Sequence, residues 1–227
     1  MAGAAAGHPA GLQWVLVESD RMTAIPTTVD YAAGTATASV ERQGTYTLLL
    51  GSTRDFSLPA GVAALGFHGA PATPPELLQG QLSDPSALQV MFQFRDGVWL
   101  VYRPSGPSIL NSLRSIDASA PLFLSLSRAT RWAGPLLFFG DREVPVASGF
   151  TAVTYTGLDA VTPEELLAQF ANPGAVSAIF LFDNALGGYR TFRAAGPSVL
   201  NDLELVQPFD VFFVLADRAT SLLIPEG

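Results

Sequence analysis

The chain has 227 residues, of which 48% are hydrophobic and 14% are charged, and its formal net charge is −8. These values are typical of a folded protein, and the acidic balance disfavours partners that present phosphate groups, such as nucleic acid or anionic lipid. The absence of cysteine and lysine excludes thiol catalysis, disulfides, Schiff-base chemistry and a phosphate-loop lysine. No apolar stretch approaches the roughly twenty residues of a membrane-spanning helix, so we expect no membrane span.

The N-terminal part predicts short β elements after a loose start. The expected pieces, in chain order, are a flexible terminus at 1–11, a strand at 12–26 that turns at Ser19-Asp20, a loop at 27–34 and a hairpin at 35–50. We group the strand and the hairpin as an N-terminal region, 12–55.

The rest of the chain repeats itself at a spacing of ninety residues. Gly106-Pro107-Ser108-Ile109-Leu110-Asn111-Ser112-Leu113 returns as Gly196-Pro197-Ser198-Val199-Leu200-Asn201-Asp202-Leu203, and 10 of the 25 positions from 106 to 130 are identical to their partners. A fixed internal spacing of this kind predicts two copies of one structural unit. We place the copies at 56–137 and 138–227.

Each copy predicts the same elements. A short strand and a glycine lead into a longer strand, and a helix start follows at Thr73-Pro74-Pro75-Glu76 and at Thr162-Pro163-Glu164-Glu165. There the Thr can cap the helix, Pro suits its first turn, and the Glu can return a bond to the cap. Pairs of strands joined by turns are expected next, at 88–94 with 98–103 and at 176–182 with 189–193.

The repeated Gly-Pro-Ser stretch is expected to form a single helical turn that pins the next strand, with Asn111 and Asn201 bonding backbone groups. That strand is followed by Arg128-Ala129-Thr130 or Arg218-Ala219-Thr220, and a similar strand before Arg21 indicates a third copy of this closing hairpin. Since three copies need not share a ligand, we interpret these arginines as structural partners of the sheet or its carbonyls.

The order Trp99, Pro104, Pro107, Leu110-Asn111-x-Leu113 and an aromatic strand at Phe123 resembles a repeat module of bacterial secreted and cell-surface proteins. In that family an aromatic hairpin is followed by a Pro-containing loop, Leu-Asn-Asp-Leu and a closing aromatic strand. The resemblance covers roughly 56–137 and 144–225. It implies a surface module, usually linked to larger assemblies, whose own ligand is not defined.

No catalytic or metal-binding constellation is evident. His68 is interpreted as a surface or strand-end histidine, because a Ser-His-acid site needs partners that the pattern does not supply. A capping box accounts for the acidic pair Glu164 and Glu165. Turn geometry alone accounts for Asp96, Asp183 and Asn184. We therefore expect no enzyme, no cofactor and no metal.

Aromatic and arginine side chains at matching positions of the two predicted hairpins form the candidate binding set. They are Trp99, Tyr102 and Arg103 in the first copy and Tyr189, Phe192 and Arg193 in the second. Aromatic residues and Arg dominate binding hot spots, and aromatic rings stack on sugars. The competing interpretation is that alternate members face the core and the others cover it.

We expect an α+β, mainly β protein: two tandem β-rich units, each with one short capped helix and related by approximate twofold symmetry, plus the N-terminal strand and hairpin. The expected function is a non-enzymatic secreted or cell-surface structural or interaction module, binding a protein partner or a second copy through strand edges. Two alternatives stay open. One is a carbohydrate-binding accessory module that uses the hairpin aromatics, and the other is a hydrolase with an acidic pair.

Overall fold

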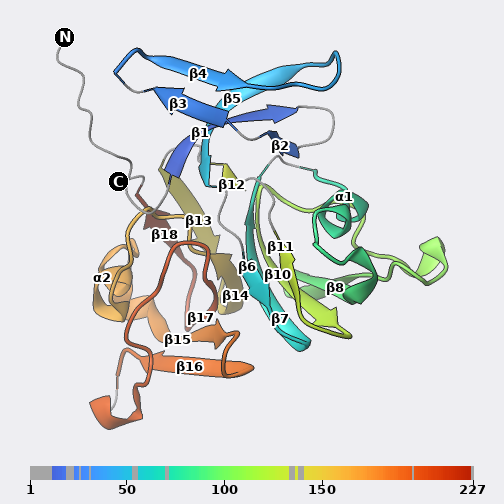
Figure 1. Cartoon of the computed structure of the whole chain (residues 1–227). Coiled ribbons are helices and arrows are strands. Elements are labelled where there is room, and N and C mark those ends of the chain that lie inside the picture. Colours follow the sequence, from blue (N-terminus) through green and yellow to red (C-terminus); the bar gives the residue numbers. More distant parts are fainter. Residues whose placement is uncertain are drawn as a thin grey trace.

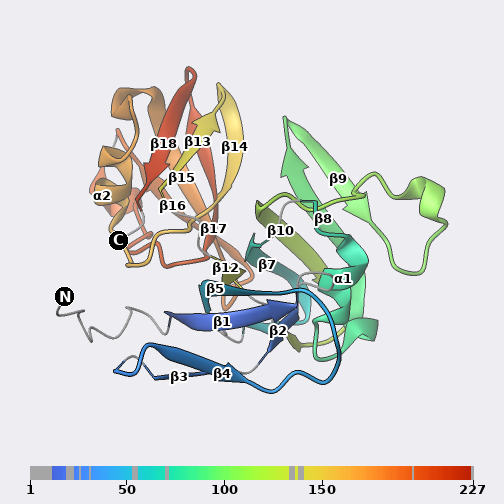
Figure 2. The same cartoon turned by 90° about the horizontal axis from the view of Figure 1, so that it is seen from above.

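The computed structural model describes residues 12–18, 23–25, 27–30, 32–52, 56–69, 72–132, 136–137, 141–195 and 197–225. The fold is α+β and mainly β, as predicted, with 50% strand, 13% helix and two short α-helices. The predicted flexible terminus 1–11, the turn at Ser19-Asp20 and Arg21 lie outside the described residues. Figures 1 and 2 show an N-terminal sheet that lies across one end of two similar units.

The first unit is a four-stranded antiparallel sheet with a helix beside it. Its elements are β6 (Phe56–Leu58), β7 (Gly61–His68), α1 (Pro75–Gly80), the 3-10 turn η2 (Pro85–Ala87), β8 (Leu88–Arg95), β9 (Val98–Tyr102), the 3-10 turn η3 (Ser108–Leu110), β10 (Ser119–Leu126) and β11 (Thr130–Trp132). The sheet order is β7-β10-β8-β9, while β11 pairs separately with β6. Positive φ at both Asp96 and Gly97 closes the two-residue β8–β9 turn.

The second unit repeats this topology. Its elements are β13 (Arg142–Val146), β14 (Gly149–Thr154), α2 (Pro163–Ala168), η4 (Pro173–Ala175), β15 (Val176–Asp183), β16 (Gly188–Arg193), η5 (Ser198–Leu200), β17 (Val211–Ala216) and β18 (Thr220–Ile224). The order β14-β17-β15-β16 matches that of the first sheet, and β13 pairs with β18 as β6 does with β11. The registers correspond too: Phe123 lies opposite Ala64, and Phe213 lies opposite Ala152. The repeat in the sequence is therefore a repeat of the fold.

The N-terminal sheet differs from the predicted arrangement. It consists of β12 (Leu136–Leu137), β5 (Tyr46–Ser52), β1 (Leu12–Glu18) and β2 (Thr23–Ile25), in that order, and β3 (Thr27–Asp30) pairs with β4 (Thr35–Ala38). The prediction of a loop at 27–34 and a hairpin at 35–50 was wrong. The Asp30 carboxylate accepts hydrogen bonds from the N–H groups of Ala32 and Ala33, and Gly34 has φ +64°, so the chain reverses directly after Asp30. Strand β5 is left to pair with β1 along its full length.

Only the second helix begins as predicted. The N–H of Glu165 donates to the Thr162 hydroxyl at 3.2 Å, and the N–H of Thr162 donates to the Glu165 carboxylate at 2.8 Å, which completes the capping box. In α1 the N-cap is Pro74, so the prediction of a capping Thr73 was wrong. The second proline of Pro74-Pro75 starts the helix one residue later, and Thr73 forms a β-bridge with Ile116 instead.

The repeated Leu-Asn motif covers one edge of each sheet, the edge formed by β9 or β16. The N–H of Arg103 donates to the Asn111 side-chain oxygen at 2.8 Å, and the Asn111 amide donates back to the Arg103 carbonyl at 3.3 Å. Asn201 forms the same two bonds with Arg193, at 2.9 and 3.4 Å. The predicted backbone role of both asparagines is confirmed. Strands β9 and β16 each form one edge of their sheet, with β7 and β14 at the opposite edges. These bonds therefore occupy backbone groups, within or directly after an edge strand, that could otherwise pair with another chain.

The strand before each Arg-Ala-Thr sequence does not form the predicted closing hairpin with the strand after it. Strand β10 pairs with β7 and β8, and β11 pairs with β6; β17 and β18 are separated in the same way. The reason is that β10 and β17 are inner strands with both edges occupied. Arg128 bonds to Asp84 at 2.5 Å and Arg218 bonds to the side chain of Asn172, so both serve as structural partners, as predicted, although of side chains rather than carbonyls.

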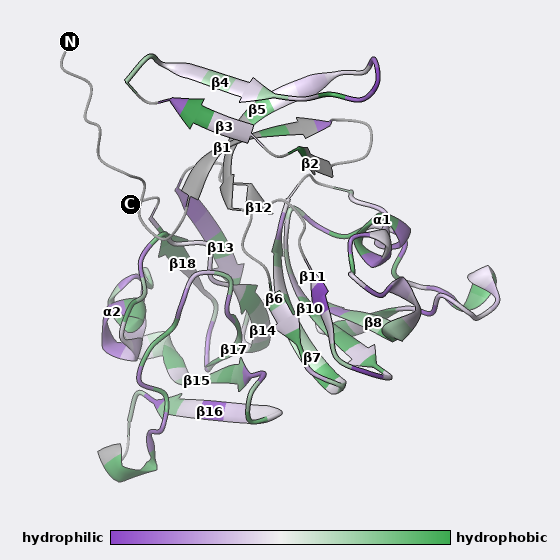
Figure 3. Cartoon of the chain, viewed as in Figure 1, coloured by the Kyte–Doolittle hydropathy of each residue, from purple (hydrophilic) through white to green (hydrophobic). Residues whose placement is uncertain are grey.

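Each unit buries its own core between sheet and helix, and a third apolar cluster lies between the two sheets. Figure 3 shows hydrophobic residues along β8 and β15. The first core also contains Leu158 and Phe209, which come from the second unit. The two units therefore pack against each other and bury part of their surface in a shared core.

Candidate binding cleft

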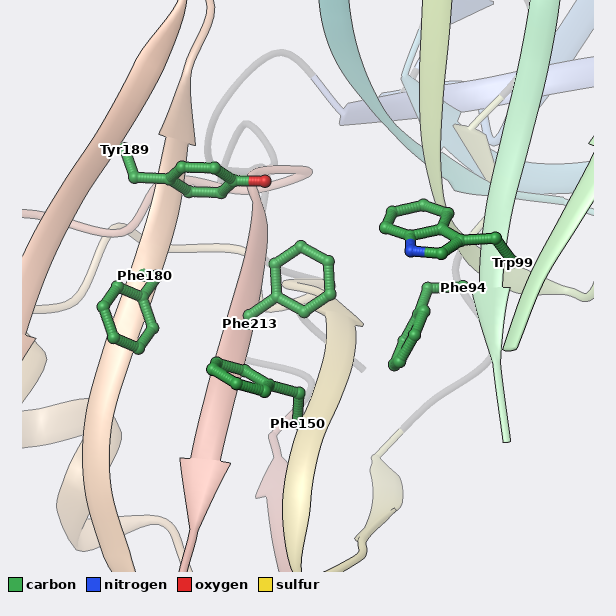
Figure 4. A pocket seen from close by; sticks show the side chains of 6 residues that line it. All are labelled: Phe94, Trp99, Phe150, Phe180, Tyr189 and Phe213. Atoms are coloured by element: carbon green, nitrogen blue, oxygen red, sulfur yellow. The ribbon is translucent and has the colours of Figure 1, made fainter. Parts of the chain in front are cut away.

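The two four-stranded sheets leave between them a cleft of about 350 Å³ that is lined by aromatic side chains. The six residues, shown in Figure 4, are Phe94 of β8, Trp99 of β9, Phe150 of β14, Phe180 of β15, Tyr189 of β16 and Phe213 of β17. The volume falls in the range of small-molecule sites. None of the six side chains carries a charge at neutral pH, so the cleft suits an apolar, planar group.

Two of the lining residues combine large exposure with a polar atom. Trp99 is 47% exposed and Tyr189 is 48% exposed. In Figure 4 the ring nitrogen of Trp99 and the hydroxyl oxygen of Tyr189 both point toward the space between the sheets. Burial raises the pKa of Tyr189, so its phenol stays protonated at neutral pH and is able to donate a hydrogen bond. The cleft therefore offers stacking faces and two donors.

Strand alternation brings the aromatic side chains to this interface. Phe92 and Phe94 lie two apart in β8, as do Phe180 and Phe182 at the matching positions of β15, so each pair faces one side of its sheet. The contacts between the units are exchanged symmetrically. Phe94 packs on Phe213 and Phe182 packs on Phe123, each with ring centroids 5.6 Å apart. Such an exchange is produced by an approximate twofold axis between the units.

The structure brings two of the six predicted binding residues to the cleft, Trp99 and Tyr189. Tyr102 and Phe192 are core residues, only 5% and 6% exposed, and the Tyr102 hydroxyl donates to Gln79 at 3.0 Å. The remaining two, Arg103 and Arg193, are exposed at the strand ends that the repeated asparagines hold. The core-facing interpretation thus describes Tyr102 and Phe192, while Trp99 and Tyr189 are available for binding.

Sequence reasoning missed the four phenylalanines that complete the cleft: Phe94, Phe150, Phe180 and Phe213. The available signal was the Phe-x-Phe spacing at 92–94 and 180–182, since a period of two marks one face of a strand. Which face meets the other unit depends on how the two sheets pack, and that relation is not visible in a local pattern.

His68 ends β7, as predicted, but it is buried rather than on the surface. Its Nδ1 lies 2.6 Å from the hydroxyl of Ser119, the residue directly opposite on β10. Burial, together with the positive charge of Arg142, lowers the pKa of His68 to about 4, so the ring is neutral at pH 7. A directly opposed cross-strand pair is sufficient to explain this contact.

Asn184 has a role that turn geometry alone does not explain. Asp183 behaves as expected, accepting from the N–H groups of Ala185 and Leu186. The Asn184 side chain instead reaches the first unit, where it accepts from the N–H of Ala64 at 2.7 Å and donates to the Ala64 carbonyl at 2.8 Å. The prediction for Asn184 was therefore wrong. The β15–β16 turn is longer than its counterpart and extends to the open edge of β7.

Within the part of the chain that the structure describes, the acidic pair and the acidic cavity do not favour hydrolysis. Glu164 and Glu165 lie exposed in the first turn of α2. A separate cavity of about 430 Å³ has Asp183, Glu204 and Asp210 in its lining, but a hydrogen bond from Arg190 lowers the pKa of Asp183. A general acid needs a raised pKa, so this environment works in the opposite direction.

Comparisons with protein-family models, with curated proteins and with solved structures gave no match. In the described part of the chain, no helix has the length and apolar character needed to cross a membrane. Among the same residues, no group of three or more His, Asp or Glu side chains is placed to hold a metal ion.

Proposed function

We propose that this protein is a non-enzymatic interaction module that receives a planar apolar group of its partner in the aromatic cleft. The observation that carries the proposal is the gathering of six aromatic side chains from both units around one open space. Two of them, Trp99 and Tyr189, expose about half of their surface. Partly exposed aromatic anchors beside a preformed apolar cavity are typical of binding sites.

Self-association through the edge strands β9 and β16 receives less support. Asn111 occupies backbone groups of Arg103, the residue directly after β9, and Asn201 occupies those of Arg193 in β16. The Leu113 N–H also donates to the Val101 carbonyl of β9 at 2.9 Å. A partner that adds a strand needs those groups free. The aromatic cleft offers side chains rather than backbone groups. We therefore favour binding of a planar apolar group in the cleft over association by strand pairing.

A carbohydrate is the second candidate ligand, because an exposed Trp99 and Tyr189 offer the ring faces on which sugars stack. The cleft lining supplies only two polar side-chain atoms, however, and a sugar carries hydroxyl groups all round its ring. The lining therefore suits an aromatic or aliphatic group better. By the resemblance of its repeats, we place the protein outside the cell or at the cell surface.

The proposal is tested by titrating 2-naphthamide, an uncharged planar probe, into the full chain and following Trp fluorescence and heat. We expect saturable binding that Tyr189→Ala weakens by about tenfold, the effect of losing one well-packed aromatic contact. Ile109→Ala, an exposed apolar residue on η3 outside the cleft, is the matched control and should leave binding unchanged. Equal affinities for all three proteins would place the probe elsewhere and refute the proposal. A glycan array, with Trp99→Ala as the paired variant, separates the carbohydrate alternative.

A further inference from the structure

The space between the units has two equivalent sides, and one of them is filled. There Asn184 bonds to the backbone of Ala64, and Phe209 packs against Phe56 with ring centroids 6.1 Å apart. A Cβ on Gly66 would lie 2.1 Å from the Phe209 carbonyl oxygen, so only glycine permits this approach. Phe209 itself has φ +70°, a conformation that non-glycine residues rarely adopt.

On the other side the equivalent residues leave a cavity of about 620 Å³. The sequence offset of 88 to 90 residues between the units gives the equivalents of Asn184, Ala64, Phe209 and Phe56 as Asp96, Ala152, Ser119 and Val144. All four line the cavity. Ser119 thus occupies the position that corresponds to Phe209 on the filled side, and its side chain is much smaller. Of the two equivalent sides of the interface between the units, one is therefore filled by side chains and the other, the open side, contains a cavity.

The open side contains a partly buried cation, Arg142, that forms no ion pair with a described residue. Arg142 of β13 lines the cavity, and its hydrogen bond is to the Thr154 carbonyl at 3.5 Å. Within the described residues, no carboxylate lies in ion-pairing distance of Arg142. Burial lowers the pKa of Arg142 to about 10, because a cation that is partly removed from water is less stable in its charged form. Arg95 lines the same cavity, and its Nε is buried without a hydrogen-bond partner in the described structure.

The acidic groups of the cavity do not cancel the charge of Arg142. Asp117 is bound by Arg95 at 2.7 Å and by the Gln93 amide at 2.7 Å. Asp96 lies exposed on the β8–β9 turn, where water solvates it. A charge that is partly removed from water gains more from an opposite charge than an exposed one does. The cavity therefore favours an anion near Arg142 over a cation near Asp96.

The open cavity and the aromatic cleft are neighbours. Phe94 and Phe150 line both of them. We propose that the open cavity binds the carboxylate of a small ligand whose planar apolar part lies in the aromatic cleft. This inference rests on the proposed function of the cleft and adds the ligand class, an aryl carboxylate. Arg142 supplies the ionic hydrogen bonds, and the Ser119 hydroxyl lies in the same lining.

The test uses a matched pair of probes, 2-naphthoate and 2-naphthamide, titrated calorimetrically into the full chain. We expect the wild type to bind the carboxylate about tenfold more tightly than the amide, since ionic hydrogen bonds carry that difference. Arg142→Gln should remove this preference while leaving the amide affinity unchanged, and Arg142→Lys should keep part of it. Arg114→Gln removes an exposed charge that lines neither cavity and should behave as wild type.

The outcomes separate the two proposals. Equal affinity of wild type for both probes, or a preference for naphthoate that persists in Arg142→Gln, overturns the carboxylate site and leaves the cleft proposal standing. Failure of both probes to saturate the wild type overturns both. Unchanged amide binding by Arg142→Gln also shows that this variant is folded, so loss of the carboxylate preference cannot be attributed to unfolding.

Discussion

Phe123 and Phe213, ninety residues apart in the sequence, stack with ring centroids 5.7 Å apart and ring planes inclined by 20°. They are equivalent residues of the two units, so each ring contacts its own counterpart. A twofold axis places equivalent residues in contact in this way, as in symmetric dimers of separate chains. Here the two halves are joined covalently. The duplication therefore creates the interface between the units, and the aromatic cleft lies beside this stack, with Phe213 in its lining.

Removal of one ring from this stack should destabilise the whole chain. Phe123 is 4% exposed and packs among apolar residues of both units, so Phe123→Ala is expected to lower the free energy of unfolding by about 3–5 kcal/mol. Phe150→Ala removes a ring that is 52% exposed and should cost about 1 kcal/mol. Urea denaturation of both variants checks the difference. Equal losses would mean that the stack is not the centre of the interface.

Gly66 tests the filled side of the interface. Gly66→Ala forces the Phe209 backbone away, and we expect a loss of about 1–3 kcal/mol. A Cβ added to Gly80, the last residue of α1, would meet no other part of the structure within 4 Å, so Gly80→Ala should raise stability by about 0.5–1 kcal/mol. Thermal unfolding should move the two midpoints in opposite directions. A neutral Gly66→Ala variant would contradict the close approach of the units.

The internal repeat predicts the two-unit fold because turn residues, helix starts and apolar strands are local signals. Most strand positions follow from them, as do the clamps of Asn111 and Asn201. Three errors arose where a distant partner decides the structure. Strand β5 pairs with β1 rather than with β4, β10 has no free edge for β11, and the side chain of Asn184 reaches the other unit.

The candidate cleft could be predicted only in part for the same reason. Trp99 and Tyr189 are visible as matched aromatics, but their sequence neighbours do not show which sheet face is covered. Tyr102 lies three residues from Trp99 and is buried under α1, bonded to Gln79. The phenylalanines of β14, β15 and β17 join the site only because two sheets pack face to face.

The edge clamp of the first unit should respond differently to two substitutions of Asn111. Asn111→Ala removes both bonds to Arg103 and is expected to cost about 1 kcal/mol and to promote association through β9. Asn111→Asp keeps the acceptor for the Arg103 N–H and should lose less stability and remain monodisperse. Urea denaturation and light scattering measure the two effects. If both variants behave alike, the side-chain bonds are not what protects this edge.

His68 should make the stability of the protein depend on pH between about 6.5 and 4. Its pKa is about 4 in the folded protein and has its ordinary value of 6.5 in the unfolded chain, so the unfolded chain binds the proton more readily. The stabilisation is complete above pH 6.5 and is lost as the pH falls toward 4, by about 3 kcal/mol in total. Hydrogen bonds also lower the pKa values of the Asp84, Glu165 and Asp183 carboxyls, and the stabilisation that they contribute is lost only at the acid end of this window and below it. Chemical denaturation at a series of pH values should therefore show a slope between pH 6.5 and 4.5 that His68→Gln abolishes. A slope that persists in His68→Gln would assign the titration to another group.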